Sequence, residues 1–426
     1  FIILMVSLRF VYTRTLLAEK LKTELNGSVI VNLEANNRNI LNQIETHLNN
    51  GVTIFLFAFE NLPNKVITQR DALKLNVLKV LSQYTNNNLT VKVFWFRSPF
   101  SNTNYVDRFN TYQVLSEIGQ KIKMYPKLDT LFNINSKRYY AQLYEEKTHK
   151  NSNANRMLVP WTIAKFINNE ADLDDFLRLV KNAGESIISE LQNVNRMNVN
   201  NKHNRMNVNN MNVLLRENLN KELFILKVGF SGSAQGLYTG LTIEDILNED
   251  RLKSLIEFRY ANKNYLLNTI IFQPQISTYS ELMNNSTTRR FGSGKSSHEY
   301  RFFYVNDSLM PFVVTSRMNN TGQHAFVSIK ESNLNKNNKT YKHLVTASLF
   351  ARNVYTFVKN KNPSFKDILT RIDVVYFPEH KKFYLAEIET ASGIGPLFAR
   401  SMNTINQPWS GTKELIQKMG TLIRNK

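Results

Sequence analysis

The side chains most suited to chemistry lie in two short stretches near the carboxyl end of the chain, 371–376 and 383–389. Both stretches alternate with a period of two, and a largely polar link with one proline joins them, so they predict a β-hairpin. Charged residues recur at every second position of each strand, namely Arg371, Asp373, Glu387 and Glu389. If the two charged faces coincide, three carboxylates and one guanidinium meet in a small volume. Such a cluster needs a cation, and carboxylate oxygens suit Mg²⁺.

The same hairpin could instead be exposed, with charged positions that are simply solvated, which is the commoner situation. A second element favours chemistry over that alternative. Residues 223–228 predict a strand that carries Lys227 near its end, and a loop with three glycines, 229–236, follows it. Glycine lets backbone N–H groups turn toward phosphate oxygens, and a lysine adds a mobile positive charge beside them. The two elements together favour a site for phosphate groups and a divalent cation.

Taken in chain order, these elements resemble the ATP-grasp superfamily, which includes D-alanine–D-alanine ligase and the carboxylate–amine ligases. The resemblance covers about residues 130–400. It rests on the order of several segments: 133–139, where a lysine opens a helix, then 158–162, 223–236, 270–276, 299–305, the hairpin, and 392–396 after it. One position departs from the family pattern, because Glu389 stands where asparagine is commoner. The extra charge leaves open whether one or two Mg²⁺ ions bind.

The resemblance implies a fold of mixed α/β and α+β class, in which two α+β lobes grip ATP after a small α/β domain. It implies that Asp373, Glu387 and Glu389 bind Mg²⁺. It also implies that Arg371 stabilises the transferred phosphoryl group and that Lys227 acts on the phosphates and in catalysis. The other residues that it implies around ATP are Lys137, Ser231, Gly232, Ser233, Gly236, Gln273, Gln275 and Glu299.

The implied reaction is an ATP-dependent ligation. A substrate carboxylate takes the γ-phosphoryl group to give an acyl phosphate, and an amine or similar nucleophile then displaces phosphate. The backbone around Gln273 and Gln275 would contact adenine, and Glu299 would bind the ribose hydroxyls unless it pairs with Arg301 instead. The partners would be small-molecule or peptide carboxylates and amines. Two alternatives stay open: an ATP-grasp kinase, and a basic binding or structural protein that keeps the fold without the activity.

The order of the elements predicts four segments. Residues 1–128 alternate helix-like runs with strand-like ones at 28–33, 52–59 and 89–96, which predicts a small α/β domain with a parallel sheet. Residues 129–222 predict a linker and the first helices, with a disordered asparagine-rich insertion at 193–213 that contains a near-duplicated unit. Residues 223–300 would form a small lobe with the phosphate loop, and 301–426 a large lobe with the metal-binding hairpin.

Composition narrows the class of protein. The chain of 426 residues, of which 42% are hydrophobic, can fill the cores of two or three domains. It has no cysteine, which excludes disulfides and cysteine zinc sites and predicts a cytoplasmic, reducing compartment. The first 8 residues are apolar but too few to span a bilayer, so we expect no membrane partner and either a truncated first element or a start at Met5. The net charge of +20 allows a nucleic-acid partner. The alternative is that the charge comes from a lysine-rich composition, because the basic residues are dispersed along the chain and do not form one run.

Overall fold

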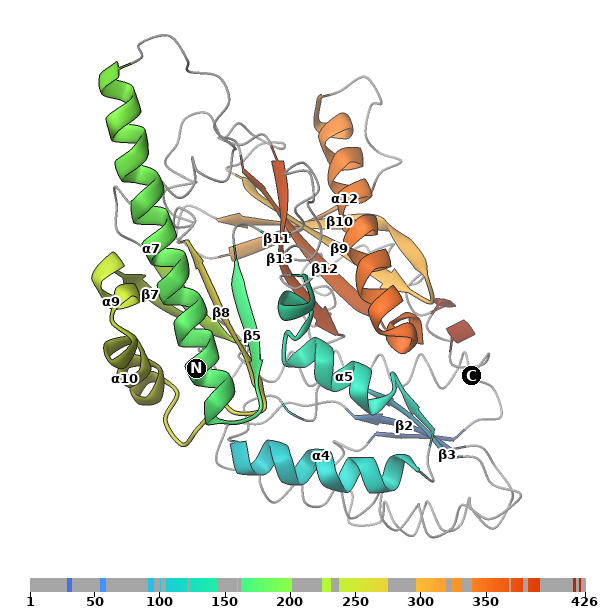
Figure 1. The fold of residues 1–426 in the computed structure, drawn as a ribbon. Coiled ribbons are helices and arrows are strands. Elements are labelled where there is room, and N and C mark those ends of the chain that lie inside the picture. Colours follow the sequence, from blue (N-terminus) through green and yellow to red (C-terminus); the bar gives the residue numbers. More distant parts are fainter. Residues whose placement is uncertain are drawn as a thin grey trace, which may run out of the picture.

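The fold is given by a computed structural model, drawn in Figure 1. The residues that the structure describes are 29–32, 54–58, 91–95, 100, 105–120, 123–143, 159, 162–200, 224–230, 237–274, 296–318, 324–330, 339–367, 369–377, 382–390, 417–418 and 421–422. In this part of the chain the strands form three sheets, with helices packed around them.

The first sheet lies in the amino-terminal part of the chain and is parallel throughout. Its strands follow sequence order: β1 (Val29–Asn32), β2 (Ile54–Ala58), β3 (Val91–Trp95) and β4 (Lys123–Tyr125). The three strands predicted for this region are therefore present, and their parallel pairing is typical of an α/β domain. The helix α4 (Tyr105–Gly119) connects β3 to β4. The helix-like runs between the first three strands lie outside the described residues.

The second sheet is antiparallel. Its order is β5 (Ile163–Ile167), β8 (Asn268–Pro274), β6 (Phe224–Val228) and β7 (Leu237–Leu241). Three helices pack with it: α7 (Glu170–Asn200), α9 (Ile243–Leu247) and α10 (Glu249–Arg259). Phe176 of α7, Ile246 of α9 and Leu252 of α10 share one apolar core with Phe224 and Phe272 of the sheet. Figure 1 shows α7 running along this sheet as its longest cover.

The end of α7 corrects one prediction from the sequence. The asparagine-rich stretch 193–213 is expected to be a disordered insertion, but α7 continues to Asn200 and includes its first part. Adding residues to an existing helix is much easier than starting a new one, because the amphipathic part of α7 has already formed the costly nucleus. The prediction is therefore wrong for 193–200, and 201–213 lie outside the described residues.

The third sheet is also antiparallel and holds the predicted hairpin. Its order is β11 (His324–Lys330), β10 (Ser308–Met318), β9 (Ser296–Val305), β12 (Thr370–Phe377) and β13 (Lys382–Thr390). The helix α12 (Lys339–Lys361) and the short 3₁₀ helix η3 (Pro363–Asp367) precede β12 and pack against the sheet. The hairpin predicted at 371–389 is confirmed as β12 and β13.

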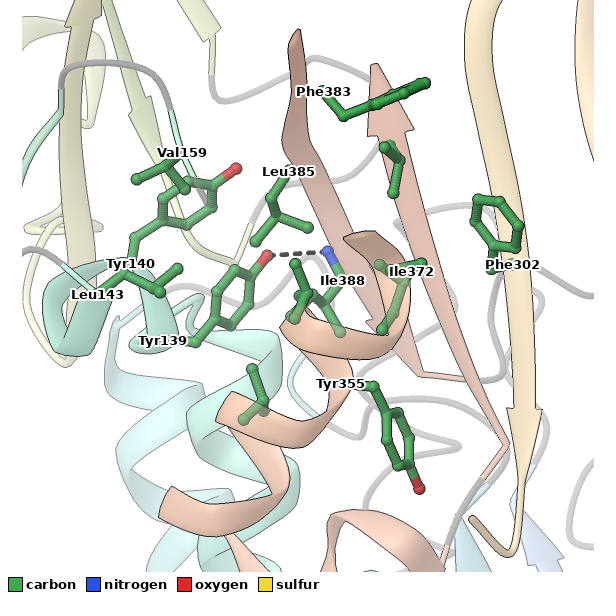
Figure 2. Packing of buried hydrophobic residues seen from close by; sticks show 14 of the residues in the cluster. Tyr139, Tyr140, Leu143, Val159, Phe302, Tyr355, Ile372, Phe383, Leu385 and Ile388 are labelled. Carbon is green, nitrogen blue, oxygen red and sulfur yellow. Dashed lines mark hydrogen bonds between the residues drawn. The ribbon is translucent and has the colours of Figure 1, made fainter. Parts of the chain in front are cut away.

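The helix α5 (Leu128–Asn135) and the short helix 139–143 after it bring the sheets together. Figure 2 shows Tyr140 with its neighbours beside Leu385 of β13. The same apolar core contains Ile271 of β8, so the second and third sheets share contacts. This core therefore sets the distance between the Lys227 strand and the hairpin.

The sheets divide the chain differently from the predicted segments. The strand β5, within the predicted segment 129–222, pairs with β8 of the segment 223–300. The predicted boundary at residue 300 falls within β9, which pairs with β10 and β12. The class is as predicted in broad terms, since helices pack with both parallel and antiparallel sheets. None of the described helices has the length and the apolar character that a membrane span requires.

Candidate active site between the second and third sheets

The charged faces of the hairpin coincide. Arg371 of β12 lies directly across from Glu389 of β13, and Asp373 lies across from Glu387. The register shifts just beyond this pair, because Val374 pairs with Leu385 and Ala386 is left as the extra residue of a β-bulge. A bulge turns the strand and re-aims the side chains next to it. The structure thus confirms the predicted convergence of three carboxylates and one guanidinium.

Arg371 is the centre of this cluster. Its Nε and Nη2 atoms donate to the two carboxylate oxygens of Asp373 at 2.7 and 2.6 Å, and its Nη1 lies 3.0 Å from Oε2 of Glu389. Burial alone would lower the pKa of Arg371, but Asp373 and Glu389 raise it, so the guanidinium stays charged. A fork that holds a carboxylate by two bonds also fixes direction. Asp373 is buried, and Arg371 therefore holds it in one orientation.

Glu387 has a different counter-ion. The Nζ of Lys137 lies 2.7 Å from its Oε1. Burial opposes the charged form of Glu387, but Lys137 and then Arg371 outweigh burial and lower the pKa of this carboxyl. Burial raises the pKa of Glu389, with Arg371 acting against that shift and Glu387 adding to it. Of these neighbouring carboxylates, Glu387 is thus the one favoured as an anion.

Lys137 reaches the hairpin because of the turn that follows α5. The turn occupies residues 136–138, and Lys137 itself has a φ of 56°, in the left-handed region. The Ser136 N–H donates to Phe132 O and the Arg138 N–H to Asn133 O, so backbone bonds hold the turn. A residue with a Cβ adopts this conformation at a cost of about 1 kcal/mol or more. The sequence predicted a lysine that opens a helix, and Lys137 lies just before helix 139–143.

Lys227 approaches from the second sheet. Its Nζ donates to the hydroxyl of Tyr140 at 3.3 Å and lies 4.5 Å from the centre of the Tyr140 ring. Burial, and to a smaller extent the charge of Lys137, lower the pKa of Lys227 to about 7, with Glu387 acting against that shift. The strand position predicted for Lys227 is confirmed, since β6 runs from Phe224 to Val228.

The root of the glycine-rich loop is docked against the Lys137 turn. A Cβ added to Gly229 would lie 1.8 Å from the Ser136 carbonyl oxygen, so no other residue fits there without movement. The Gly229 N–H donates to Thr269 O at 3.0 Å, and the Phe230 N–H donates to Oδ1 of Asn268 at 3.1 Å. The loop residues predicted to contact ATP lie outside the described residues: Ser231, Gly232, Ser233 and Gly236.

The predicted nucleotide residues in the remaining strands are spread over both sheets. Gln273 is buried in β8, and its Nε2 donates to the hydroxyl of Thr162 at 2.7 Å, so its side chain is already engaged. Glu299 lies in β9 opposite Val375, and its side chain lies outside the described residues. Gln275 also lies outside them.

Sequence reasoning missed Tyr139 and Tyr140. The Tyr140 hydroxyl donates to Ala386 O at 2.6 Å, and the Ile388 N–H donates to the Tyr139 hydroxyl at 3.0 Å, the bond dashed in Figure 2. These two bonds fix the backbone on either side of Glu387. The only signal in the sequence was a tyrosine pair soon after Lys137, and tyrosine pairs are common in ordinary cores.

The carboxylates fit Mg²⁺ as a pair rather than as a trio. Within the described residues, no group of three or more histidine, aspartate or glutamate side chains is arranged to hold a metal ion. Glu387 and Glu389 share one face and keep 29% and 27% of their side-chain surface exposed, whereas Asp373 keeps 4%. Because Mg²⁺ commonly takes one or two carboxylates and completes its shell with water and phosphates, this pair fits it.

Among known proteins, the chain matches solved structures at low similarity. No protein-family model matches the sequence, and no curated protein does. Solved structures that match include D-alanyl-alanine synthetase A of Vibrio cholerae O1 biovar eltor, with a TM-score of 0.40 and 11% identity over 88% of this chain and 99% of that chain. D-alanine–D-alanine ligase of Helicobacter pylori matches with a TM-score of 0.32 and 12% identity over 78% of this chain and 70% of that chain.

A third match is the biotin carboxylase domain of a 2-oxoglutarate carboxylase from Hydrogenobacter thermophilus, in complex with MgADP. Its TM-score is 0.39 and its identity 8%, over 88% of this chain and 69% of that chain. The chain is similar to these three structures over much of its length. Because these scores and identities are low, the proposals below rest on the side chains of this chain itself.

Proposed function

We propose that this chain binds Mg²⁺ and ATP between its second and third sheets and uses ATP to join a carboxylate to an amine or a similar nucleophile. One observation carries the proposal: two lysines, from β6 and from the turn after α5, lie beside the carboxylate strand β13. Lys137 contacts Glu387, and Lys227 lies on Tyr140, whose hydroxyl bonds to Ala386 beside Glu387. A site with separate positive and negative halves suits a metal–triphosphate, which carries both signs of charge.

The positive half would bind the phosphates. Lys227 and Lys137 present ammonium groups, and the glycine-rich loop begins at Gly229, immediately after β6. In this proposal Lys137 leaves Glu387 for a phosphate oxygen when the nucleotide arrives. The loop residues Ser231, Gly232, Ser233 and Gly236 would close over the phosphates and exclude water.

The negative half would hold the metal. Glu387 and Glu389 are the ligands that we propose, and Asp373 stays a predicted third ligand whose present contact is Arg371. Mg²⁺ bound there would neutralise charge on the phosphate oxygens. The fork to Asp373 keeps Arg371 in one direction, so that its remaining N–H groups can stabilise the phosphoryl group and the tetrahedral centre of the second step. We also propose the backbone near Gln273 and Gln275 for adenine and Glu299 for ribose.

The reaction that suits this arrangement has two displacements. A carboxylate oxygen of the substrate attacks the γ-phosphorus of ATP, and ADP leaves with the electron pair of the broken P–O bond. The nucleophile then attacks the carbonyl carbon of the acyl phosphate, and inorganic phosphate leaves. The chain contributes orientation and charge to both steps, which is where most of the rate enhancement in phosphoryl transfer arises.

Calorimetry of Mg²⁺ and ATP binding tests the proposal. The wild-type chain should bind ATP only when Mg²⁺ is present, and both Lys227→Ala and Glu387→Gln should lose most of the affinity. Lys165→Met is the matched control, because Lys165 lies on β5 of the same sheet but pairs with Asp175 at 3.1 Å and Asp172 at 3.6 Å. Equal binding by wild type and both site variants would contradict the proposed site. If the wild type binds ATP tightly and both site variants do not, measuring the release of ADP in the presence of different carboxylates and amines would identify the substrates.

A further inference from the structure

Tyr140 connects the two halves of the proposed site. It comes from helix 139–143, which belongs to neither half, and it is fully buried in the core that joins the second and third sheets. On one side its hydroxyl accepts from Lys227 of β6 at 3.3 Å. On the other side the same hydroxyl donates to Ala386 of β13 at 2.6 Å. A single oxygen atom therefore contacts both strands that carry the charged groups.

The contact on β13 falls at a special point of that strand. Ala386 is the extra residue of the β-bulge, and the next residue is Glu387. The extra residue of a bulge lacks a partner in the ladder, so its carbonyl needs another donor when it is buried. Tyr140 supplies that donor. The direction of Glu387 thus depends on a carbonyl that Tyr140 holds.

The contact on β6 uses both parts of the tyrosine. The Lys227 ammonium lies over the aromatic ring as well as within hydrogen-bond distance of the hydroxyl. The ring attracts the cation and the hydroxyl gives it a direction. A leucine at position 140 could fill the core but could do neither, and a phenylalanine would keep the ring without the hydroxyl. The hydroxyl therefore orients the Lys227 ammonium, a role that packing alone does not explain.

We propose that Tyr140 is a positioning residue, which fixes the Lys227 ammonium relative to the bulge that aims Glu387. This inference deepens the proposed function and rests on it for its purpose, namely to keep the phosphate-binding and metal-binding halves in register. Tyr139 is its neighbour and differs in one useful way. Its hydroxyl accepts from the Ile388 N–H of β13, and among the contacts of the described residues none joins it to Lys227.

A double-mutant cycle tests the inference. Tyr140→Phe removes only the hydroxyl and should weaken ATP binding about tenfold, the effect of one hydrogen bond to a charged group. In a Lys227→Met background the same change should weaken binding by a smaller factor, because only the bond to Ala386 is then left to lose. Tyr139→Phe is the matched control, and its effect on binding should be the same in both backgrounds. An equal loss from Tyr140→Phe in both backgrounds would overturn the inference.

A second measurement needs no nucleotide. The Lys227 ammonium is followed by NMR of the lysine-labelled chain as the pH is raised. Tyr140→Phe should move the titration of Lys227 to lower pH, because the hydroxyl that accepts a hydrogen bond from the ammonium favours its charged form. Tyr139→Phe should leave it unchanged. No movement in Tyr140→Phe would overturn the inference, whatever the chain does with ATP.

The two measurements distinguish a failure of the proposed function from a failure of the inference about Tyr140. If the wild type fails to bind ATP with Mg²⁺, the proposed function falls, and the Lys227 titration still decides whether Tyr140 holds the lysine. Unfolding by urea is recorded for every variant, with Tyr304→Phe as the reference for loss of a buried hydroxyl. Tyr304 is 2% exposed, and its hydroxyl has no hydrogen-bond partner in the described structure. A loss of stability alone, without a change in the Lys227 titration, would show that Tyr140 is only a core residue.

Discussion

Arg371 and Lys227 are both cations of the candidate site, but the two strands hold them in opposite ways. Arg371 on β12 is bound by two carboxylates through three short contacts, and its pKa is raised. Lys227 on β6 is held by a tyrosine hydroxyl and ring, and burial lowers its pKa to about 7. A cation with buried counter-charges is locked in place, whereas one held by a neutral partner gains much from a new anion. Arg371 is therefore the locked cation of the site. Lys227, which would gain from a new anion, is the receptive cation.

The largest effect is expected when the locked cation is removed. Arg371→Met leaves Asp373 buried without its fork and should destabilise the chain by about 3–5 kcal/mol, the usual loss when one partner of a buried pair is removed. Urea unfolding measures this. Lys253→Met is the control, because Lys253 and Asp174 form an exposed pair at 2.8 Å, which should contribute about 1 kcal/mol or less. Similar losses from the two variants would break the comparison.

The next largest effect is expected at Gly229, where the glycine-rich loop begins. Gly229→Ala brings a Cβ against the Ser136 carbonyl and should destabilise the chain by about 3 kcal/mol, at the upper end of overpacking costs. It should also weaken ATP binding, because the loop root and the Lys137 turn must separate. Gly119→Ala is the control, since its nearest atoms would be 3.8 Å away. Unchanged stability in Gly229→Ala would mean that the loop root is not docked as described.

Removing the receptive cation itself should cost little stability. Lys227→Met should destabilise the chain by no more than about 1 kcal/mol, because the methionine keeps the packing and no buried carboxylate loses a fork. ATP binding should nevertheless fall by about tenfold or more, the effect of a lost hydrogen bond to a charged group. Calorimetry and urea unfolding on the same samples separate the two effects. A stability loss as large as that of Arg371→Met would erase the difference between the two cations.

The most specific effect is a pH dependence. The folded pKa of Lys227, about 7, lies below that of a free lysine, about 10.4, so between these values the unfolded chain binds more protons than the folded one. The contribution of Lys227 to stability therefore rises with pH in this window and is flat below it. Lys227→Met should lack that rise when unfolding is measured from pH 6 to 10.

Affinity for ATP should run the other way with pH. As the pH rises through about 7, the ammonium of the free chain loses its proton and phosphate binding weakens. Lys227→Arg keeps its charge and should bind with a flatter profile, if less tightly, since the guanidinium does not deprotonate in this range. A wild-type profile as flat as that of Lys227→Arg would contradict a receptive lysine.

Much of the hairpin could be predicted from the sequence alone. Period-two alternation is a local property. It therefore placed Arg371 and Asp373 on one face of the first strand, and Glu387 and Glu389 on one face of the second strand, before any pairing was known. The strand of Lys227 was predictable for the same reason. The end of α7 was not, because asparagine-rich composition describes an isolated segment, whereas the helix before it had already formed the nucleus.

The sequence by itself determined the residue types of the site, the strands that carry them and the order that resembles a known superfamily. The tertiary structure decided which charges meet. The pairing of Lys137 with Glu387, the fork of Arg371 on Asp373 and the Tyr140 bridge each join residues through register, a bulge or a left-handed turn. A one-residue change of register turns every side chain of a strand to the other face, so local pattern cannot decide such contacts. Only the packed sheets, which balance burial against charge, select one arrangement.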